Sequence, residues 1–175
     1  EDDAASKAVQ AEQVAEVVGL GAIKYFDLSH SLSSDYTFDI DTMLSLEGNT
    51  APYMMYAYAR IRSIGRKAGV NLAELPAAAA IVLGHPTEIA LAKKLAQFAE
   101  KFAVVEAELR PNVLTDYLYE LAKTFSRFYD KKLGVRVIDA SPESLRLSRL
   151  RLCDITARTL KLGLFLLGIQ TIEQM

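Results

Sequence analysis

Tyrosines and arginines follow one another closely in one short stretch of this chain. Residues 45–63 read SLEGNTAPYMMYAYARIRS, with three tyrosines followed by two arginines. Tyrosine rings can stack on unpaired RNA bases, and guanidinium groups can bind the phosphates beside those bases. The composition therefore suits an RNA-binding surface, provided that a helix holds these side chains on an exposed face.

The spacing of residues 51–68 divides such a helix into faces, because positions three, four and seven apart lie together. The three resulting stripes are Tyr53, Tyr56, Arg60 and Lys67; then Tyr58, Arg62 and Arg66; then the apolar Ala57, Ile61, Ile64 and Ala68. Both polar stripes cannot be buried, so at least one presents arginines to solvent or to a partner. From periodicity alone, an ordinary solvated face, with tyrosines packing by their rings, is the default explanation of the pattern.

Two further places carry the same chemistry. The last predicted helix is basic, and Arg151 and Arg158, seven residues apart, can line one groove that binds phosphates. Tyr129 precedes two lysines and can serve as a base-stacking platform, although core packing explains the nearby phenylalanines. A solvated helix face remains the alternative for the basic residues.

Catalytic and metal-binding chemistry finds little support. Gly19-Leu20-Gly21 lacks the third glycine of a dinucleotide-binding loop. The two histidines are far apart and have no cysteine beside them, which argues against zinc. The single cysteine, Cys153, is expected to be a buried apolar residue in a reducing compartment. We predict no catalytic residue and no metal ligand.

Composition favours helices. Leucine and alanine dominate the 175 residues, and no apolar run is long enough to span a bilayer, so we expect no membrane partner. Residues 1–47 carry a net charge of −8 and residues 48–175 a net charge of +6. The mildly basic larger part permits a nucleic-acid partner.

Cap residues and apolar periodicity place the elements. Helices are expected at 7–28, 51–68 after Asn49 or Thr50, 87–108 after Thr87, 113–130, and 141–167 with Ser141 as cap and Pro142 in first position. Residues 36–41 form a short strand or an extended segment in which Asp41 caps a turn. We predict an all-α bundle of four to five helices with a short N-terminal helical or extended appendage, divided into 1–47 and 48–175.

Four segments carry a resemblance to a known family over nearly the whole chain. The chain resembles the C-terminal region of the arginyl-tRNA synthetases, class I enzymes that attach arginine to tRNA with ATP. The similar segments, in the family's order, are GLGAIKYFDLS (19–29), YTFDIDTMLSLEGNTAPYMMYAYARIRSI (36–64), YLYELAKTFSRFYD (117–130) and LRLCDITARTLKLGLFLLGIQTIEQM (150–175). The family commonly has glutamine at Met55 and arginine at Gln174.

The resemblance implies a helical anticodon-binding domain, called the DALR domain, over 48–175. Residues 1–47 would end the region that joins it to a catalytic domain upstream in the same chain. The synthetase signatures of that domain are not in this sequence, so the piece is expected to bind arginine tRNA without activating arginine. ATP and Mg²⁺ would serve the full-length enzyme, and this fragment would need no cofactor.

Roles follow from the resemblance for individual residues. Tyr53, Tyr56 and Tyr129 would contact splayed bases of the anticodon loop. Phosphates would be bound by Arg60, Arg66 and Lys67, with Arg151 on the last helix. The carboxylate of Met175 would approach the same loop. The enzyme would be cytoplasmic or organellar, and a helical protein-docking module without RNA binding remains the alternative.

Overall fold

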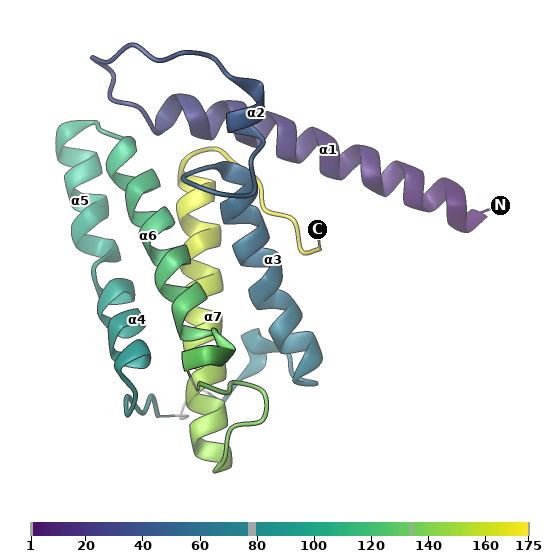
Figure 1. The fold of residues 1–175 in the computed structure, drawn as a ribbon, viewed down its shortest axis with the longest axis vertical. Coiled ribbons are helices and arrows are strands. Elements are labelled where there is room, and N and C mark those ends of the chain that lie inside the picture. The colour runs from purple at the N-terminus through teal and green to yellow at the C-terminus, as the bar shows by residue number, and fades with distance from the viewer. Residues whose placement is uncertain (1, 77–79, 134, 175) are drawn as a thin grey trace.

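The computed structural model describes residues 2–76, 80–133 and 135–174, and these fold as helices joined by loops (Figure 1). The bounds of the helices are α1 Asp2–Leu28, α2 Ile40–Met43, α3 Ala51–Lys67, η1 Leu72–Glu74, α4 Pro86–Ala96, α5 Phe98–Glu108, α6 Asn112–Phe128, η2 Lys131–Leu133 and α7 Glu143–Leu166. No β-strand occurs within the described ranges. The predicted all-α class is therefore confirmed, and the strand considered for 36–41 is not formed.

The long helices build an upright bundle with one helix lying across its end. Helix α6 packs against α3, α4, α5 and α7, and α3 also packs against α7 and α1. Figure 1 shows α1 crossing the end of the bundle and extending well beyond it. None of the helices in the described part is both long enough and apolar enough to span a membrane.

The bundle is closely packed around α6 and α7. Leu118, Leu121, Phe125 and Phe128 of α6 are fully or almost fully buried. A Cβ atom added to Gly163 of α7 would lie 2.4 Å from a methyl group of Leu118, so the Leu118 side chain packs directly against the backbone of α7. Any side chain at position 163 would have to displace Leu118.

Helix α1 is fixed to the bundle near its C-terminal end. Tyr25 is fully buried, and its hydroxyl oxygen lies 3.0 Å from the Thr115 carbonyl oxygen and 2.7 Å from Oδ1 of Asn49, the two acceptors available to its one proton. One turn earlier, a Cβ atom on Gly21 would come within 2.4 Å of the Met55 methyl group. The crossing of α1 over α3 is thus a contact that only glycine permits without a shift.

One predicted helix cap is confirmed, and two are replaced by nearby residues. Thr50 caps α3 as expected, because its hydroxyl accepts from the Tyr53 amide at 3.3 Å. Asp39 rather than Asp41 caps the short α2. His85 rather than Thr87 caps α4, where Pro86 occupies the first turn and Glu88 completes a capping box.

The start of α7 also differs from the prediction. Pro142 occupies the N-cap position and Ser141 precedes it, so the predicted serine cap with proline in first position is wrong. The amides of Leu145 and Arg146 bond to the Pro142 carbonyl, at 2.9 and 3.2 Å. The helix therefore begins on a backbone carbonyl without help from a side chain.

The predicted single helix over 87–108 is divided into α4 and α5 at Gln97. Both halves pack against α6, and the break lets each of them follow its surface. The Lys94 carbonyl, at the end of α4, accepts a hydrogen bond from the Tyr117 hydroxyl at 2.9 Å. The apolar period continues on both sides of Gln97, so the break has no local signal in the sequence.

Candidate nucleic-acid interface

One stripe of α3 reaches the surface and another is covered. Tyr56 is 44% exposed, whereas Tyr58, two residues later, is only 3% exposed. Arg66 and Lys67 are exposed at the end of the helix, and Arg60 is half-buried between them and Tyr56. The surface available to a partner therefore combines Tyr56, Arg60 and Lys67 of the first stripe with Arg66 of the second.

The end of α6 contributes an aromatic ring to this surface. The guanidinium carbon of Arg60 lies 5.2 Å from the centre of the Tyr129 ring, close enough for a cation–π contact. That ring also stacks on Phe125, with ring centres 6.1 Å apart and planes 8° apart. Burial raises the pKa of Tyr129 against the effect of the Arg60 charge, so the ring stays neutral at physiological pH.

Two adjoining grooves flank this contact. The α3 groove has a volume of about 470 Å³ and is lined by Tyr56, Ala59, Arg60, Ser63, Arg66, Lys67 and Gln174. The α6 groove has a volume of about 620 Å³ and is lined by Lys67, Tyr129, Lys131, Val135, Arg136, Val137, Ile138 and Asp139. Lys67 belongs to both grooves, and the Arg60–Tyr129 contact joins their walls.

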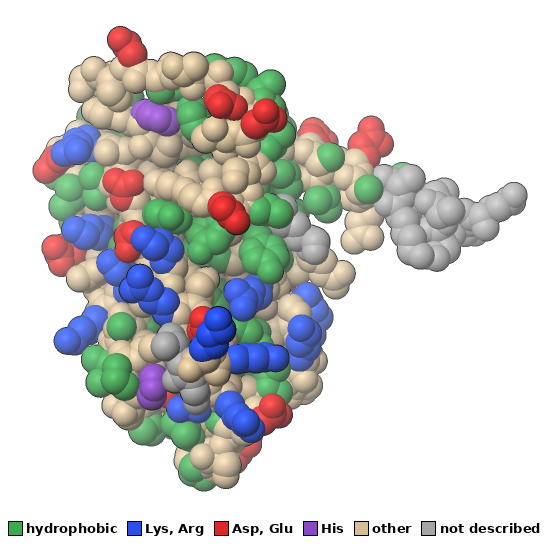
Figure 2. All heavy atoms as spheres, in the orientation of Figure 1, with side chains coloured by type: hydrophobic (Ala, Val, Ile, Leu, Met, Phe, Trp, Pro, Cys, Tyr) green, Lys and Arg blue, Asp and Glu red, His purple; other side chains and the backbone are tan. Residues whose placement is uncertain are grey.

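The charges around the grooves are mainly positive. Figure 2 shows lysine and arginine side chains gathered over the middle and lower part of this face, with acidic ones more common toward the α1–α2 end. The cationic groups of the linings come from α3, η2 and the following loop. Cationic grooves with an aromatic ring in the wall can bind a single strand by its phosphates and stack its bases.

The structure brings together five of the eight residues predicted for RNA binding, which are Tyr56, Arg60, Arg66, Lys67 and Tyr129. Tyr53 lies elsewhere on α3, half-buried, with its ring edge-on to Tyr119 at 5.8 Å. Met175 lies outside the described residues. Contact of any of these residues with RNA stays a prediction.

Arg151, the remaining predicted residue, points to a different part of the protein. Its guanidinium group donates to the carbonyls of Leu75, at 3.2 Å, and Pro76, in the segment after η1. These bonds hold that segment against α7. Its predicted role in binding phosphate stays untested, but the structure gives the side chain another task.

Arg136 and Gln174 are among the groove residues that were not predicted from the sequence. Arg136 lies between the buried Val135 and Val137, and this alternation of buried and exposed residues was the available signal. Gln174 enters the α3 groove only because the C-terminal segment returns to α3. That return is a long-range contact, and the local sequence carries no sign of it.

The remaining candidate chemistry is structural. Cys153 is fully buried, and burial raises the pKa of its thiol far above the ordinary value, so it stays protonated. Over the described ranges, no group of three or more histidine, cysteine or acidic side chains is placed to hold a metal ion.

Comparison with known proteins agrees with this arrangement. The family model described as "DALR anticodon binding domain" matches residues 54–175. The chain is 58% identical over 164 residues to a protein of Nostoc sp. named arginine–tRNA ligase, covering 94% of this chain and 28% of that protein. A protein of the same name from Synechocystis sp. is 56% identical over 163 residues, covering 93% and 27%.

Solved structures give the same likeness in three dimensions. The arginyl-tRNA synthetase of Plasmodium falciparum superposes with a TM-score of 0.85 at 35% identity, covering 99% of this chain and 30% of that one. The enzyme of Thermus thermophilus gives a TM-score of 0.81 at 37% identity, covering 94% and 28%. The chain spans less than a third of the length of these relatives. Because the family model covers most of the residues, including both grooves, the chain belongs to the DALR anticodon-binding domain family.

Proposed function

We propose that this chain binds the anticodon loop of an arginine tRNA through the α3 and α6 grooves. Membership of an anticodon-binding family supports a tRNA ligand, and the names of the relatives support arginine as its amino acid. The observation that carries the proposal is the Arg60–Tyr129 contact, which joins two cationic grooves into one surface.

Each groove residue has a role in this proposal. Tyr56 and Tyr129 stack on unpaired bases of the loop, and Arg60, Arg66 and Lys67 bind the phosphates beside them. The carboxylate of Met175 accepts hydrogen bonds from base edges. Tyr53, which packs on Tyr119 and lines neither groove, makes a smaller contribution.

The proposal extends to a full-length enzyme of the kind that the relatives are named for. We place this chain in the C-terminal part of an arginine–tRNA ligase, working beside a catalytic domain of the same polypeptide. That catalytic domain would use ATP and Mg²⁺, whereas the anticodon-binding part would take no cofactor. The enzyme would act where its tRNA serves translation, in the cytoplasm or in an organelle.

Titration of a labelled RNA tests the central claim. An RNA hairpin with the arginine anticodon loop should bind the chain, and its affinity should fall steeply with salt because phosphate contacts release counterions. A hairpin with the same stem and an all-uridine loop should bind more weakly. Equal affinity for both hairpins, or an affinity that salt does not change, contradicts anticodon binding.

Two exposed tyrosines make a matched pair of variants. Tyr56→Ala should weaken binding of the arginine hairpin by about 1–3 kcal/mol, the contribution of one stacked base, while leaving the thermal unfolding midpoint unchanged. Tyr36 is 42% exposed but lies on the acidic loop before α2, so Tyr36→Ala should leave binding intact.

Weak retention on heparin together with intact binding to another protein would favour the docking alternative.

A further inference from the structure

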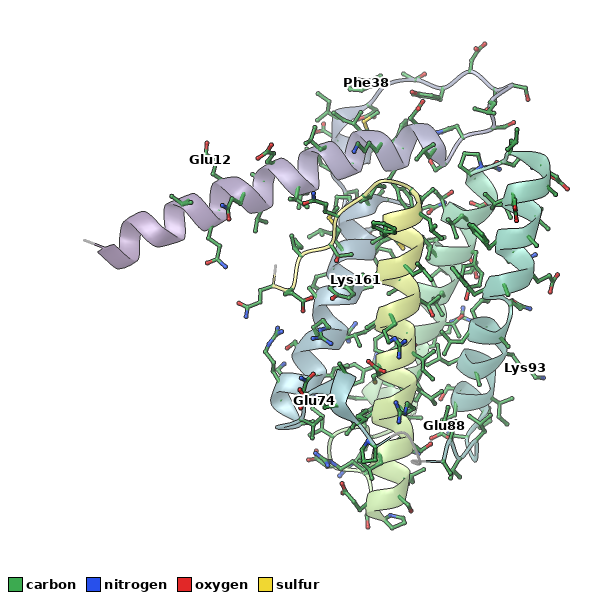
Figure 3. The ribbon with its side chains drawn as sticks, turned by 180° about the vertical axis from the view of Figure 1, so that it is seen from behind. Glu12, Phe38, Glu74, Glu88, Lys93 and Lys161 are labelled. Carbon is green, nitrogen blue, oxygen red and sulfur yellow. The ribbon has the colours of Figure 1, made fainter. Side chains whose placement is uncertain are left out.

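The C-terminal segment 169–174, here called the C-terminal strap, folds back over α3. Gly168 ends α7 with a φ of 70°, a left-handed conformation that suits glycine. Ile169 is then buried at 3% exposure, and Ile172 packs against the core. Figure 3 shows the strap turning at the end of α7 and running beside α3.

Glu173 ties this strap to the second polar stripe of α3. The Tyr58 hydroxyl donates to one carboxylate oxygen at 2.5 Å, and Nε of Arg62 donates to the other at 2.9 Å. Arg66 also reaches the Glu173 carbonyl, at 3.4 Å. Burial opposes ionisation of Glu173, but the bonds from Tyr58 and Arg62 outweigh it and lower the pKa of the carboxyl, so Glu173 is charged at neutral pH.

Through its bonds to Tyr58 and Arg62, Glu173 has two effects on the candidate interface. It sets the position of Gln174, the next residue, which lines the α3 groove together with Tyr56 and Arg60. It also places a carboxylate on Arg62, which lies one turn from Arg66 on the same helix. An RNA phosphate that approached Arg62 would have to displace this carboxylate.

We propose that Glu173 is a specificity-determining positioning residue, which holds the strap as a wall of the α3 groove and withholds Arg62 from RNA phosphates. This inference rests on the proposed binding of RNA in that groove. Phosphate contacts attract any RNA, whereas a shaped wall beside an unpaired base favours particular bases. Glu173 therefore lowers the non-specific attraction and raises the selective one.

Removal of the carboxylate should move these two quantities in opposite directions. In the 175-residue chain, Glu173→Ala should weaken binding of the arginine hairpin and strengthen binding of the all-uridine hairpin. The ratio of the two affinities should fall about tenfold, which corresponds to about 1.4 kcal/mol. The slope of log affinity against log salt should steepen by about 0.7 for both RNAs, the value for one further ion pair with a single strand.

Two other variants separate charge from shape. Glu173→Gln keeps the length of the side chain and an acceptor for Tyr58, so it should steepen the salt slope while retaining more of the discrimination. Glu108 is paired with Arg110 at 3.1 Å, and both are about half exposed. That pair lies before α6, whose 17 residues separate it from Tyr129 by about 25 Å. Glu108→Ala should therefore leave both the ratio and the slope unchanged.

The outcomes distinguish this inference from the proposed function. If the wild-type chain binds neither hairpin, or both equally, anticodon binding itself fails. If the wild-type chain discriminates and Glu173→Ala keeps both the ratio and the slope, the role of Glu173 fails alone. An equal loss of affinity for both RNAs with an unchanged slope also overturns it, because the strap would then only stabilise the fold. Circular dichroism checks folding, and Glu173→Gln supplies the same readout should the alanine variant unfold.

Discussion

Helices α3 and α7 are both rich in arginine, yet their guanidinium groups have different surroundings. On α7, Arg146 donates to the carbonyls of Ile138 and Ala68, and Arg149 donates to Glu88 and to the Arg136 carbonyl. On α3, Arg60 lies over the Tyr129 ring in the wall of an open groove. Arg146 and Arg149 of α7 thus hold other segments to the bundle, whereas Arg60 of α3 lines a groove that is open to solvent.

The partners of the arginines indicate where an RNA-binding surface lies in such a protein. A count of arginines gives both helices similar weight. The hydrogen-bond partners separate them, because a guanidinium group that already binds carbonyls or a buried carboxylate has few donors left for a phosphate. Each of the following changes tests whether α7 stabilises the fold and α3 binds the ligand.

The largest expected effect is on the α7 side. Glu88 is fully buried, pairs with Arg149 at 2.6 Å and accepts from the Gly84 and His85 amides. Glu88→Ala leaves the arginine, 12% exposed, without its partner. The free energy of unfolding, measured by urea denaturation, should fall by about 3–5 kcal/mol. Glu143→Ala, which removes the 63% exposed partner of Arg146, should cost less than about 1 kcal/mol.

The same pair should make the bundle sensitive to acid. Burial opposes ionisation of Glu88, but Arg149 and the two amides outweigh it and lower the pKa of the carboxyl. A lowered folded-state pKa gives stability that is present above the unfolded value of about 4.3 and is lost as the pH falls through the folded value. The urea midpoint should therefore drop more steeply in wild type than in Glu88→Gln between about pH 5 and pH 3. Parallel curves would contradict this.

At the proposed RNA-binding surface, loss of the Tyr129 ring should reduce RNA affinity. Tyr129→Ala should cost about 1–3 kcal/mol of binding to the arginine hairpin, since one base loses its stacking partner. The ring also packs on Phe125, so unfolding is measured in parallel. Tyr129→Phe keeps both stacking and packing and should bind normally. A similar loss in the phenylalanine variant would assign the effect to the hydroxyl instead.

Arg151 provides the most direct test of whether α7 stabilises the fold or binds RNA. Its bonds to the Leu75 and Pro76 carbonyls predict that Arg151→Gln lowers the free energy of unfolding by about 1.5 kcal/mol and leaves RNA affinity unchanged. Loss of RNA affinity with unchanged stability would instead confirm the role that the sequence predicts for this residue and would make α7 part of the interface.

The smallest expected effect concerns a single charge. Lys67 lines both grooves, so Lys67→Gln should make the salt slope of RNA binding shallower by about 0.7. Stability should change by no more than about 0.5 kcal/mol. Lys93, on the outer side of α4 in Figure 3, supplies the control, because Lys93→Gln should leave the slope as it was. Equal changes in both variants would indicate a general charge effect.

Local signals in the sequence were enough for much of the fold. Thr50 and Pro52 mark the start of α3, and Gly168 marks the end of α7, because cap and glycine preferences act over a few residues. The break between α4 and α5 was not predicted because it depends on how both helices pack against α6. His85 was overlooked as a cap because serine, threonine, asparagine and aspartate are the usual choices.

The candidate site was predictable only in part. Tyr56 and Tyr58 look alike in the sequence, but Tyr58 is buried in the core and its hydroxyl bonds to Glu173, 115 residues later. Arg149 and Arg60 likewise differ only in partners that lie on other elements. Residue types therefore indicated the chemistry, whereas the choice of residues that can reach a ligand depended on contacts between distant segments.

The crossing of α1 over α3 has a mechanical consequence. Helix α1 is a stiff rod of 27 residues, gripped at Gly21 and Tyr25 and projecting beyond the bundle from there (Figure 1). A sideways force on the projecting arm acts as a torque at the grip. A Cβ atom at Gly21 would meet the methyl group of Met55, whose neighbour in the chain is Tyr56. A side chain at position 21 would therefore have to displace Met55, on the turn of α3 that carries the first ring of the α3 groove.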